Sequence, residues 1–287
     1  DGINGLDYLI YKNKKHPEWI TSAKENGLIL NAWVGNEIDD IDWLLDNSFD
    51  YITTDEPELV FERIEKSPTS KGYELVWSDE FNYKGKPDST KWAFEYGLKR
   101  NQEKQYYVDS LKNAKVENGL LVLETHKETI KNEAFVSKDA KGWKKNWEYA
   151  NYTAPSLTTK NIAEWTYGRI EIRAQLPKGV GLWPAFWMIG ANYDEVKWPE
   201  CGEIDIMEHV GFSPDSIFGT IHTKAYNHMK GTEKGQKVFI DKPYDSFHIF
   251  ALEWTPEKLD FILDGTTYNH IENEHKTKHE WPFDQDF

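Results

Sequence analysis

The hydrophobic pattern divides the chain into two segments of different texture. In residues 1–64, short apolar runs alternate with amphipathic stretches. This alternation predicts consecutive βα units of a parallel sheet. We expect strands at 6–11, 28–34 and 49–53, and helices at 17–26, at 39–45 and from Asp55 onward.

From residue 73 the apolar runs become short, alternating and rich in β-branched and aromatic residues. Turn sequences such as Glu117-Asn118-Gly119 and Asp264-Gly265 separate them. Many short strands with such turns predict an all-β sandwich or barrel. The expected strands are 73–77, 120–125, 168–175, 204–207, 216–221, 247–254 and 259–263.

Residues 65–72 contain proline, glycine and polar residues, which is the composition of a linker. We therefore predict three parts: an α/β unit at 1–64, a linker at 65–72 and a β domain at 73–287.

Composition narrows the classes of function. Lys plus Arg is 34 and Asp plus Glu is 49, so the net charge of −15 argues against a nucleic-acid partner. The longest apolar run, 179–191, is shorter than the roughly 20 residues that a membrane span needs. The single cysteine, Cys201, allows no internal disulfide. An excess of Trp and Tyr suits a flat ligand with apolar faces and hydroxyl groups.

An acidic strand is the sharpest feature of the β domain. In Trp198-Pro-Glu-Cys-Gly-Glu203-Ile-Asp205-Ile-Met-Glu208, the first two acids of the strand share one face because side chains alternate. Glu208 is five residues from Glu203, which places it on the wrong face. One extra residue, a β-bulge near residues 206–207, would restore the parity. The sequence therefore predicts three acids on one face with a bulge between the second and the third.

Three neighbouring carboxyl groups can divide the work of cleaving a glycosidic bond, which needs one ionised and one protonated carboxyl. In this hypothesis Glu203 is the nucleophile, Glu208 is the acid/base and Asp205 holds Glu203 in place. The group would titrate as a coupled set. Two alternatives remain open from spacing alone, a solvated acidic strand face and a divalent-metal site.

Residues 202–208 resemble the active-site signature of glycoside hydrolase family 16 in its bulged form. The resemblance is strongest to laminarinases, endo-acting β-1,3-glucanases. It implies a jelly-roll β-sandwich, a sugar cleft on the concave face, hydrolysis with retention and no cofactor for catalysis. It also supports the three acid roles. Further segments that carry the resemblance are 75–81, 167–177, 181–188, 219–222 and 250–254.

Three tryptophans flank the acidic strand: Trp183, Trp187 and Trp198. An indole ring can pack against the C–H face of a pyranose, so we expect all three to bind substrate. Each could instead belong to the core, above all Trp187, which lies deep in an apolar run. The resemblance adds His222 beside the acids and Asn101 in a loop that bonds sugar hydroxyls. Arg173 is a further candidate that could equally face solvent.

Residues 27–34 and 51–57 resemble the C-terminal part of glycerophosphodiester phosphodiesterases, a (β/α)8 barrel family. The catalytic residues of that family lie mainly in earlier strands, so we interpret residues 1–64 as a barrel remnant without phosphodiesterase activity.

The chain begins with Asp1 and shows no signal peptide, and it stops at Phe287 before the strands that close the sandwich in the family. We therefore interpret it as a fragment with an incomplete jelly roll, and expect unpaired strand edges. The family's structural calcium stays undecided, with Glu80 as the one ligand at hand.

The sequence as a whole predicts a retaining endo-β-1,3-glucanase that is monomeric, acts on β-glucan, and is secreted or periplasmic by resemblance. The alternatives are a mixed-linkage β-glucanase, an agarase, or a non-catalytic carbohydrate-binding jelly roll.

Overall fold

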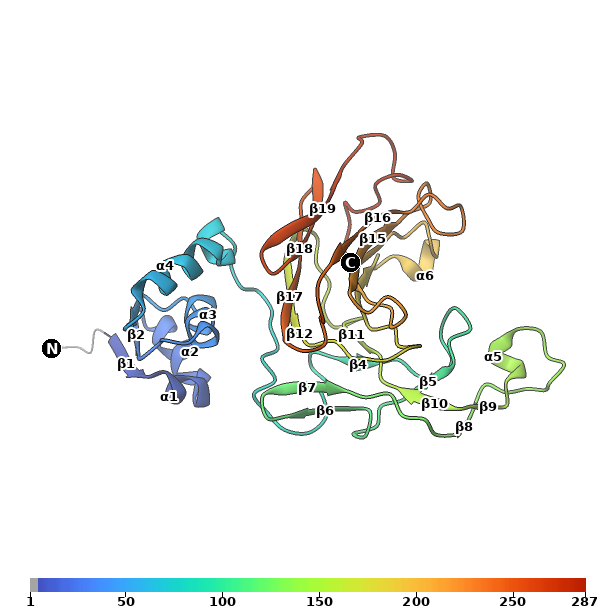
Figure 1. Ribbon diagram of the computed structural model, residues 1–287, viewed down its shortest axis with the longest axis horizontal. Helices are drawn as coiled ribbons and strands as arrows, with labels where there is room; N and C mark the ends of the chain where they lie inside the picture. Colours follow the sequence, from blue (N-terminus) through green and yellow to red (C-terminus); the bar gives the residue numbers. More distant parts are fainter. Residues whose placement is uncertain (1–4) are drawn as a thin grey trace.

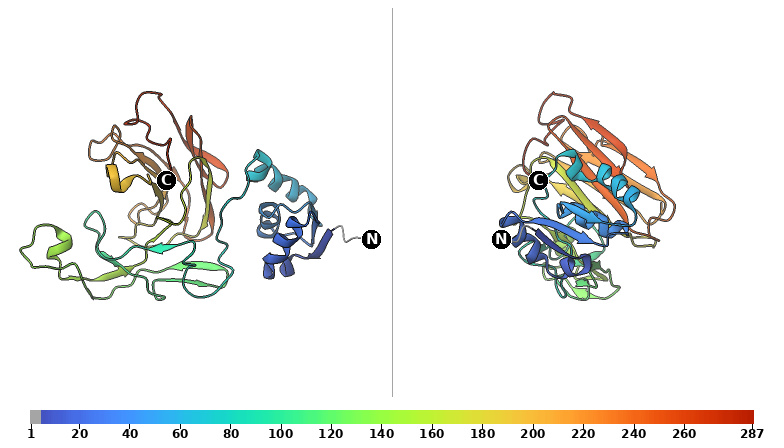
Figure 2. Two further views of the ribbon diagram at one scale, coloured as in Figure 1. Left: turned by 180° about the vertical axis from the view of Figure 1, so that it is seen from behind. Right: turned by 90° about the vertical axis from the view of Figure 1, so that its left-hand side faces the viewer.

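The computed structural model describes residues 5–287, and it shows an α/β unit followed by a larger β domain (Figure 1). A single stretch of chain joins the two, and the view from behind shows the same separation (Figure 2, left). Among the described residues, no helix has both the length and the apolar character needed to cross a membrane.

The α/β unit contains a parallel sheet of order β1-β2-β3, as the alternating pattern predicts. Leu30 and Ala32 of β2 are buried against Ile20 of α2 and Leu44 of α3. The elements are β1 (Gly5–Leu9), α1 (Ile10–Lys15), α2 (Pro17–Glu25), β2 (Ile29–Trp33), α3 (Ile38–Asp46), β3 (Tyr51–Thr53) and α4 (Pro57–Lys66).

The first strand is shorter than predicted, because residues 10 and 11 begin helix α1. Ile10 is buried in the core of the unit and Tyr11 is exposed. A short apolar run does not distinguish a strand from the first turn of a helix. The predicted linker is also more ordered than its composition indicates. Helix α4 continues to Lys66 and a 3₁₀ helix, η1, follows at Pro68–Lys71.

The β domain is built on two four-stranded antiparallel sheets. The first has the order β12-β17-β18-β19 and the second has the order β13-β14-β15-β16. Their bounds are β12 (Gly168–Ala174), β17 (His248–Trp254), β18 (Lys258–Leu263), β19 (Thr266–Glu272), β13 (Ala185–Ile189), β14 (Glu203–Glu208), β15 (Ser216–His222) and β16 (Lys234–Phe239).

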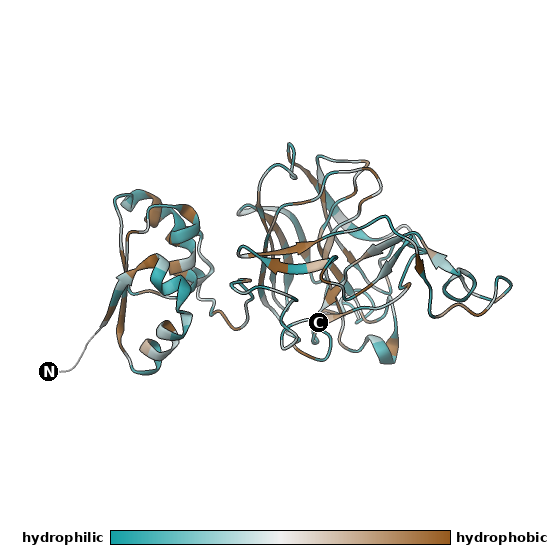
Figure 3. Cartoon of the chain, turned by 90° about the horizontal axis from the view of Figure 1, so that it is seen from below, coloured by the Kyte–Doolittle hydropathy of each residue, from teal (hydrophilic) through white to brown (hydrophobic). Residues whose placement is uncertain are grey.

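The core of the β domain lies between these sheets. Ile204 and Ile221 of the second sheet share one buried cluster with Leu252, Trp254 and Phe261 of the first. Apolar residues gather on the strands, whereas the outer loops are largely hydrophilic (Figure 3). The apolar face of β14 is therefore held in place by both sheets, and its acidic face points the other way.

The remaining strands pair two by two and do not extend the large sheets. They are β4 (Ala93–Phe94) with β11 (Leu157–Thr158), β5 (Gln105–Tyr107) with β10 (Tyr152–Ala154), β6 (Ala114–Glu117) with β7 (Leu120–Leu123), and β8 (Ile130–Lys131) with β9 (Tyr149–Ala150). Two short helices complete the domain, α5 (Trp143–Asn146) and α6 (Tyr193–Val196).

The strand predicted at 73–77 is wrong. This segment forms no ladder with any described residue, and Leu75 and Val76 are 59% and 79% exposed. An alternating pattern indicates that a segment can form a strand, but a strand also needs a neighbour whose backbone can pair with it. The other strands predicted in the β domain are observed, with ends that differ by up to two residues.

Because Phe261 is fully buried between the sheets, we expect Phe261→Ala to lower the free energy of unfolding by about 3–5 kcal/mol. Phe239→Ala is the matched control, since Phe239 is 72% exposed. We expect it to change stability by less than about 0.5 kcal/mol. Chemical denaturation measures both. Equal effects of the two variants would contradict the assignment of the core.

Candidate active site

A β-bulge in strand β14 brings the three acids to one face, as the spacing predicts. Trp187 pairs with Asp205 but the preceding Phe186 pairs with Met207, so one residue of β14 is extra. On the other side the register shifts between Asp205 and Glu208. The residues between these acids, 206 and 207, both enter the apolar core. Glu203, Asp205 and Glu208 are therefore left together on the opposite face.

Burial dominates the electrostatics of these acids. Asp205 is only 4% exposed, and Glu203 and Glu208 are half-buried. Burial, followed by the charge of Asp205, raises the pKa of Glu203 from 4.5 to about 8. Burial and then the charge of Glu208 raise the pKa of Asp205 well above its ordinary value. The three carboxyl groups therefore do not all ionise near neutral pH.

His222 lies beside this cluster at the end of β15, in register with Glu203. Its Nε2 is 3.4 Å from Oδ2 of Asp205. The imidazole is buried with only 8% exposure, and its positive charge when protonated favours ionisation of Glu203 and Glu208. The sequence-based placement of His222 near the acids agrees with this geometry.

Trp183 contacts the third acid directly. Its indole Nε1 donates a hydrogen bond of 2.8 Å to Oε1 of Glu208. Burial raises the pKa of Glu208, while this bond and the nearby His222 and His228 oppose the shift. Trp183 is 57% exposed, so it is not part of the core.

Trp187 faces the same side as the acids, because it is paired directly with Asp205. Its ring is 37% exposed, which is too open for a core residue. The guanidinium of Arg100 lies 5.1 Å from the centre of this ring and also forms an ion pair with Glu95. Sequence reasoning did not identify Arg100, although its neighbour Asn101 was singled out.

Trp198 belongs to an aromatic group at the other end of the acidic strand. Its ring centre is 6.1 Å from that of His222 and 4.9 Å from that of His228, and it stacks on the latter. His228 also meets His222 edge to face at 5.1 Å. His228 was missed because it lies in a loop, where no strand or helix period predicts where a side chain points.

The comparisons with known proteins agree with this geometry. The model of "Glycosyl hydrolases family 16" matches residues 101–286. The chain belongs to glycosyl hydrolase family 16. It is therefore a glycoside hydrolase, and enzymes of this family retain the configuration of the anomeric carbon. The family match does not reach residues 5–66, so the barrel resemblance of that unit stays a prediction.

Similar proteins include a beta-glucanase of Rhodothermus marinus, which is 44% identical over 233 residues, covering 78% of this chain and 76% of that protein. A glucan endo-1,3-beta-glucosidase of Cryptopygus antarcticus is 38% identical, with 68% of each chain covered. The X-ray structure of the laminarinase from Rhodothermus marinus superposes with a TM-score of 0.65 at 43% identity, covering 74% of this chain and 82% of that one.

Two predicted binding residues of this family 16 enzyme are not brought to the acids. Arg173 lies on β12 of the first sheet, where it points away from the core. Its guanidinium contacts Asp39 of the α/β unit at 3.2 Å and lies 4.3 Å from the centre of the Phe247 ring. Asn101 is exposed in a turn, and none of the described contacts joins it to the acidic strand.

A metal site does not assemble around Glu80, which is exposed. Among residues 5–287, one group of His, Cys, Asp and Glu side chains is close enough to share an ion, and it consists of Glu203, Asp205 and His222. Glu80 is not part of that group. The structural calcium therefore stays undecided.

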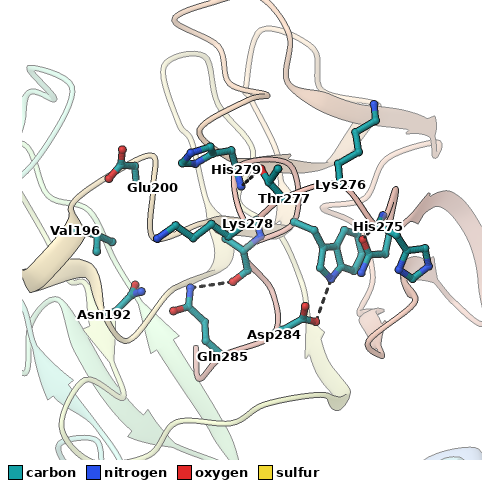
Figure 4. Close-up of a pocket in the computed structure, with 13 residues that line it drawn as sticks. Asn192, Val196, Glu200, His275, Lys276, Thr277, Lys278, His279, Asp284 and Gln285 are labelled. Carbon is teal, nitrogen blue, oxygen red and sulfur yellow. Dashed lines mark hydrogen bonds between the residues drawn. The ribbon is translucent and has the colours of Figure 1, made fainter.

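A pocket of about 450 Å³ lies near the C-terminal segment and not at the acids (Figure 4). Asn192 and Glu200 line one part, and Asp284 and Gln285 another. Trp281 donates a hydrogen bond to Asp284 at 3.3 Å within it. No residue of the acidic strand β14 lines this pocket, so we do not assign the glycosidase chemistry to it.

The raised pKa of Glu203 makes the folding stability of the protein depend on pH. Between its ordinary pKa of 4.5 and about 8, the folded state binds more protons than the unfolded state, so wild-type stability falls as the pH rises. Glutamine cannot ionise. We therefore expect the melting temperature of Glu203→Gln, relative to wild type, to increase steadily from pH 5 to pH 8.5 in scanning calorimetry.

The control for this measurement is Glu195→Gln, since Glu195 is exposed on α6. Its melting curve should follow that of the wild type at every pH. If the difference in melting temperature between Glu203→Gln and wild type is constant or shrinks as the pH rises, the pKa of Glu203 is not raised in the folded state.

Proposed function

We propose that this enzyme is an endo-acting β-1,3-glucanase that cleaves laminarin-like polymers. The observation that carries the proposal is the face of β14, where Glu203, Asp205 and Glu208 lie together beside exposed tryptophans. The relatives are named beta-glucanase and glucan endo-1,3-beta-glucosidase, which supports β-1,3-glucan as the substrate class.

In the first step of the proposed mechanism, a carboxylate oxygen of Glu203 attacks the anomeric carbon. The bond from that carbon to the glycosidic oxygen breaks, and Glu208 gives its proton to the departing oxygen. The result is a covalent glycosyl ester on Glu203. The Trp183 hydrogen bond holds the Glu208 carboxyl in position for this transfer.

In the second step, water attacks the same carbon and the ester bond to Glu203 breaks. Glu208, now ionised, takes a proton from the attacking water and regains its starting state. Two successive inversions retain the anomeric configuration. Catalysis in this scheme uses only carboxyl groups of the chain.

We assign Asp205 the task of keeping Glu203 reactive. A nucleophile must be ionised, yet burial raises the pKa of Glu203 to about 8. The pKa of Asp205 is raised well above its ordinary value, so Asp205 can hold the proton that the buried cluster retains. In the reactive form of the cluster, we propose that the proton Glu203 carries at rest has moved to Asp205, which then donates a hydrogen bond to Glu203 and leaves the charge on the nucleophile.

Sugar binding in this proposal uses the indole rings of Trp183, Trp187 and Trp198. The first two are exposed on the side of the acids, and the third lies beside His222. A pyranose presents C–H groups to such rings and hydroxyls to the polar groups around them. We also propose a location outside the cytoplasm, secreted or periplasmic, where such a polymer is met.

The main alternative to β-1,3-glucan hydrolysis is a different substrate within the same family. Mixed-linkage β-glucan and agarose present similar pyranose faces to the same residues. A non-catalytic binding jelly roll is disfavoured, because sugar binding gives no reason to bury three carboxyl groups together.

Product analysis on laminarin, lichenan and agarose tests the substrate class. We expect laminarin to be cleaved with a kcat/KM at least about 10-fold above that on lichenan. This ratio corresponds to a difference of about 1.4 kcal/mol in binding of the transition state. Short oligosaccharides should appear early, as endo cleavage requires. Preferential hydrolysis of agarose would refute the β-1,3-glucan assignment.

Variants of the acids test the assigned roles. We expect Glu203→Gln to abolish hydrolysis while laminari-oligosaccharides still bind, and Glu208→Gln to lower kcat by about 10²–10⁴. Asp205→Asn should lower kcat less than Glu203→Gln does, because it positions the nucleophile but forms no bond to the sugar. Measured kcat and calorimetric binding provide both readouts. Unchanged activity of Glu203→Gln would end the proposal.

A further inference from the structure

His228 is a titratable side chain near the acids to which the mechanism above gives no role. It lies in the loop after β15 and is exposed. Its ring stacks on Trp198, with centres 4.9 Å apart and planes inclined by 29°. It also meets His222 edge to face at 5.1 Å. His228 therefore joins an exposed loop to the aromatic group beside the acids.

The loop that carries His228 is fixed from inside. Asn227 is 1% exposed and its Nδ2 donates to the carbonyl of Thr223 at 2.9 Å. The hydroxyl of Thr232 accepts a hydrogen bond from the backbone N–H of Asn227 at 3.2 Å, and it donates to the carbonyl of Ala225 at 3.0 Å. These bonds preorganise the backbone on either side of residue 228. The stacked position of the imidazole thus follows from the loop and does not depend on a ligand.

Stacking of His228 constrains Trp198 in a specific way. One face of the indole is covered by the imidazole, and His222 tilts against the ring at 6.1 Å. A tryptophan held on one face has little rotational freedom left, so its other face is presented in one orientation. That arrangement suits a ring that must receive a pyranose beside the acids.

We infer that His228 is a substrate-positioning residue, which holds Trp198 in the orientation that stacks on the sugar next to the cleaved bond. The inference rests on the proposed function, because it needs a pyranose at Trp198. His228 acts through the indole and not on the reacting atoms. Its loss should therefore weaken substrate binding and leave the chemical step nearly intact.

A double-mutant cycle on a laminari-oligosaccharide tests this inference. We expect His228→Ala to raise KM about 3- to 10-fold, which corresponds to one aromatic stacking interaction, while kcat changes less than twofold. In the Trp198→Ala background the same change should have no further effect on KM. His228→Phe keeps a flat ring and should restore KM to within twofold of wild type.

Met229→Ala is the matched control, because Met229 is the next residue of the same loop and is 77% exposed. Its kinetics should equal those of the wild type. If His228→Ala lowers the melting temperature, His228→Gln completes the cycle with a polar side chain that lacks a ring. Additive effects of the His228 and Trp198 variants, or a fall in kcat without a rise in KM, would overturn the inference.

Failure of the proposed function gives a different result. A wild-type enzyme that does not cleave the laminari-oligosaccharide contradicts the substrate assignment before any variant is compared. The cycle is then run on the polymer that product analysis selects. There, coupling between His228 and Trp198 supports the positioning role and additivity refutes it.

Discussion

Burial of three carboxyl groups on one short strand is the constraint on which the site depends. Each of Glu203, Asp205 and Glu208 loses hydration, the charges of Asp205 and Glu208 raise the pKa of Glu203, and the charge of Glu208 raises the pKa of Asp205. A protein surface gains nothing from such an arrangement, because a dispersed set of carboxylates is more stable. A glycosidase does gain from it, since it needs a carboxylate and a carboxylic acid within reach of one sugar.

The bulge in β14 makes that arrangement compatible with a stable fold. Without an extra residue, a regular strand would turn Glu208 into the core or pull the apolar side chains out of it. With the bulge, residues 206 and 207 are both buried and the third acid returns to the face of the first two. The neighbouring strands then supply Trp187 opposite Asp205 and His222 opposite Glu203. Catalytic geometry and core packing are thus two consequences of one irregularity.

Sequence reasoning reached this irregularity because parity is a local property. Glu203 and Glu208 are five positions apart, and in a regular strand residues an odd number of positions apart lie on opposite faces. The two acids can therefore share a face only if the strand contains a bulge. The parallel order of β1, β2 and β3 was predictable from alternation for a similar reason. The predictions that were wrong concern features that depend on tertiary contacts. The segment 73–77 has a strand-like pattern but no described pairing partner, and Arg173 turns toward Asp39 on the outer side of the first sheet. His228 lies in a loop whose course only the folded backbone defines.

The proposed mechanism requires the acidic cluster to retain a proton near neutral pH. NMR titration of the protein with ¹³C-labelled carboxyl groups in Asp and Glu tests it most directly, with Glu203→Gln and Glu208→Gln used to assign the resonances. We predict that the side chains of the cluster titrate above their ordinary range, with Glu203 near 8 and with coupled curves. Three independent titrations, all complete below about pH 5 as for solvated carboxyl groups, would contradict the account.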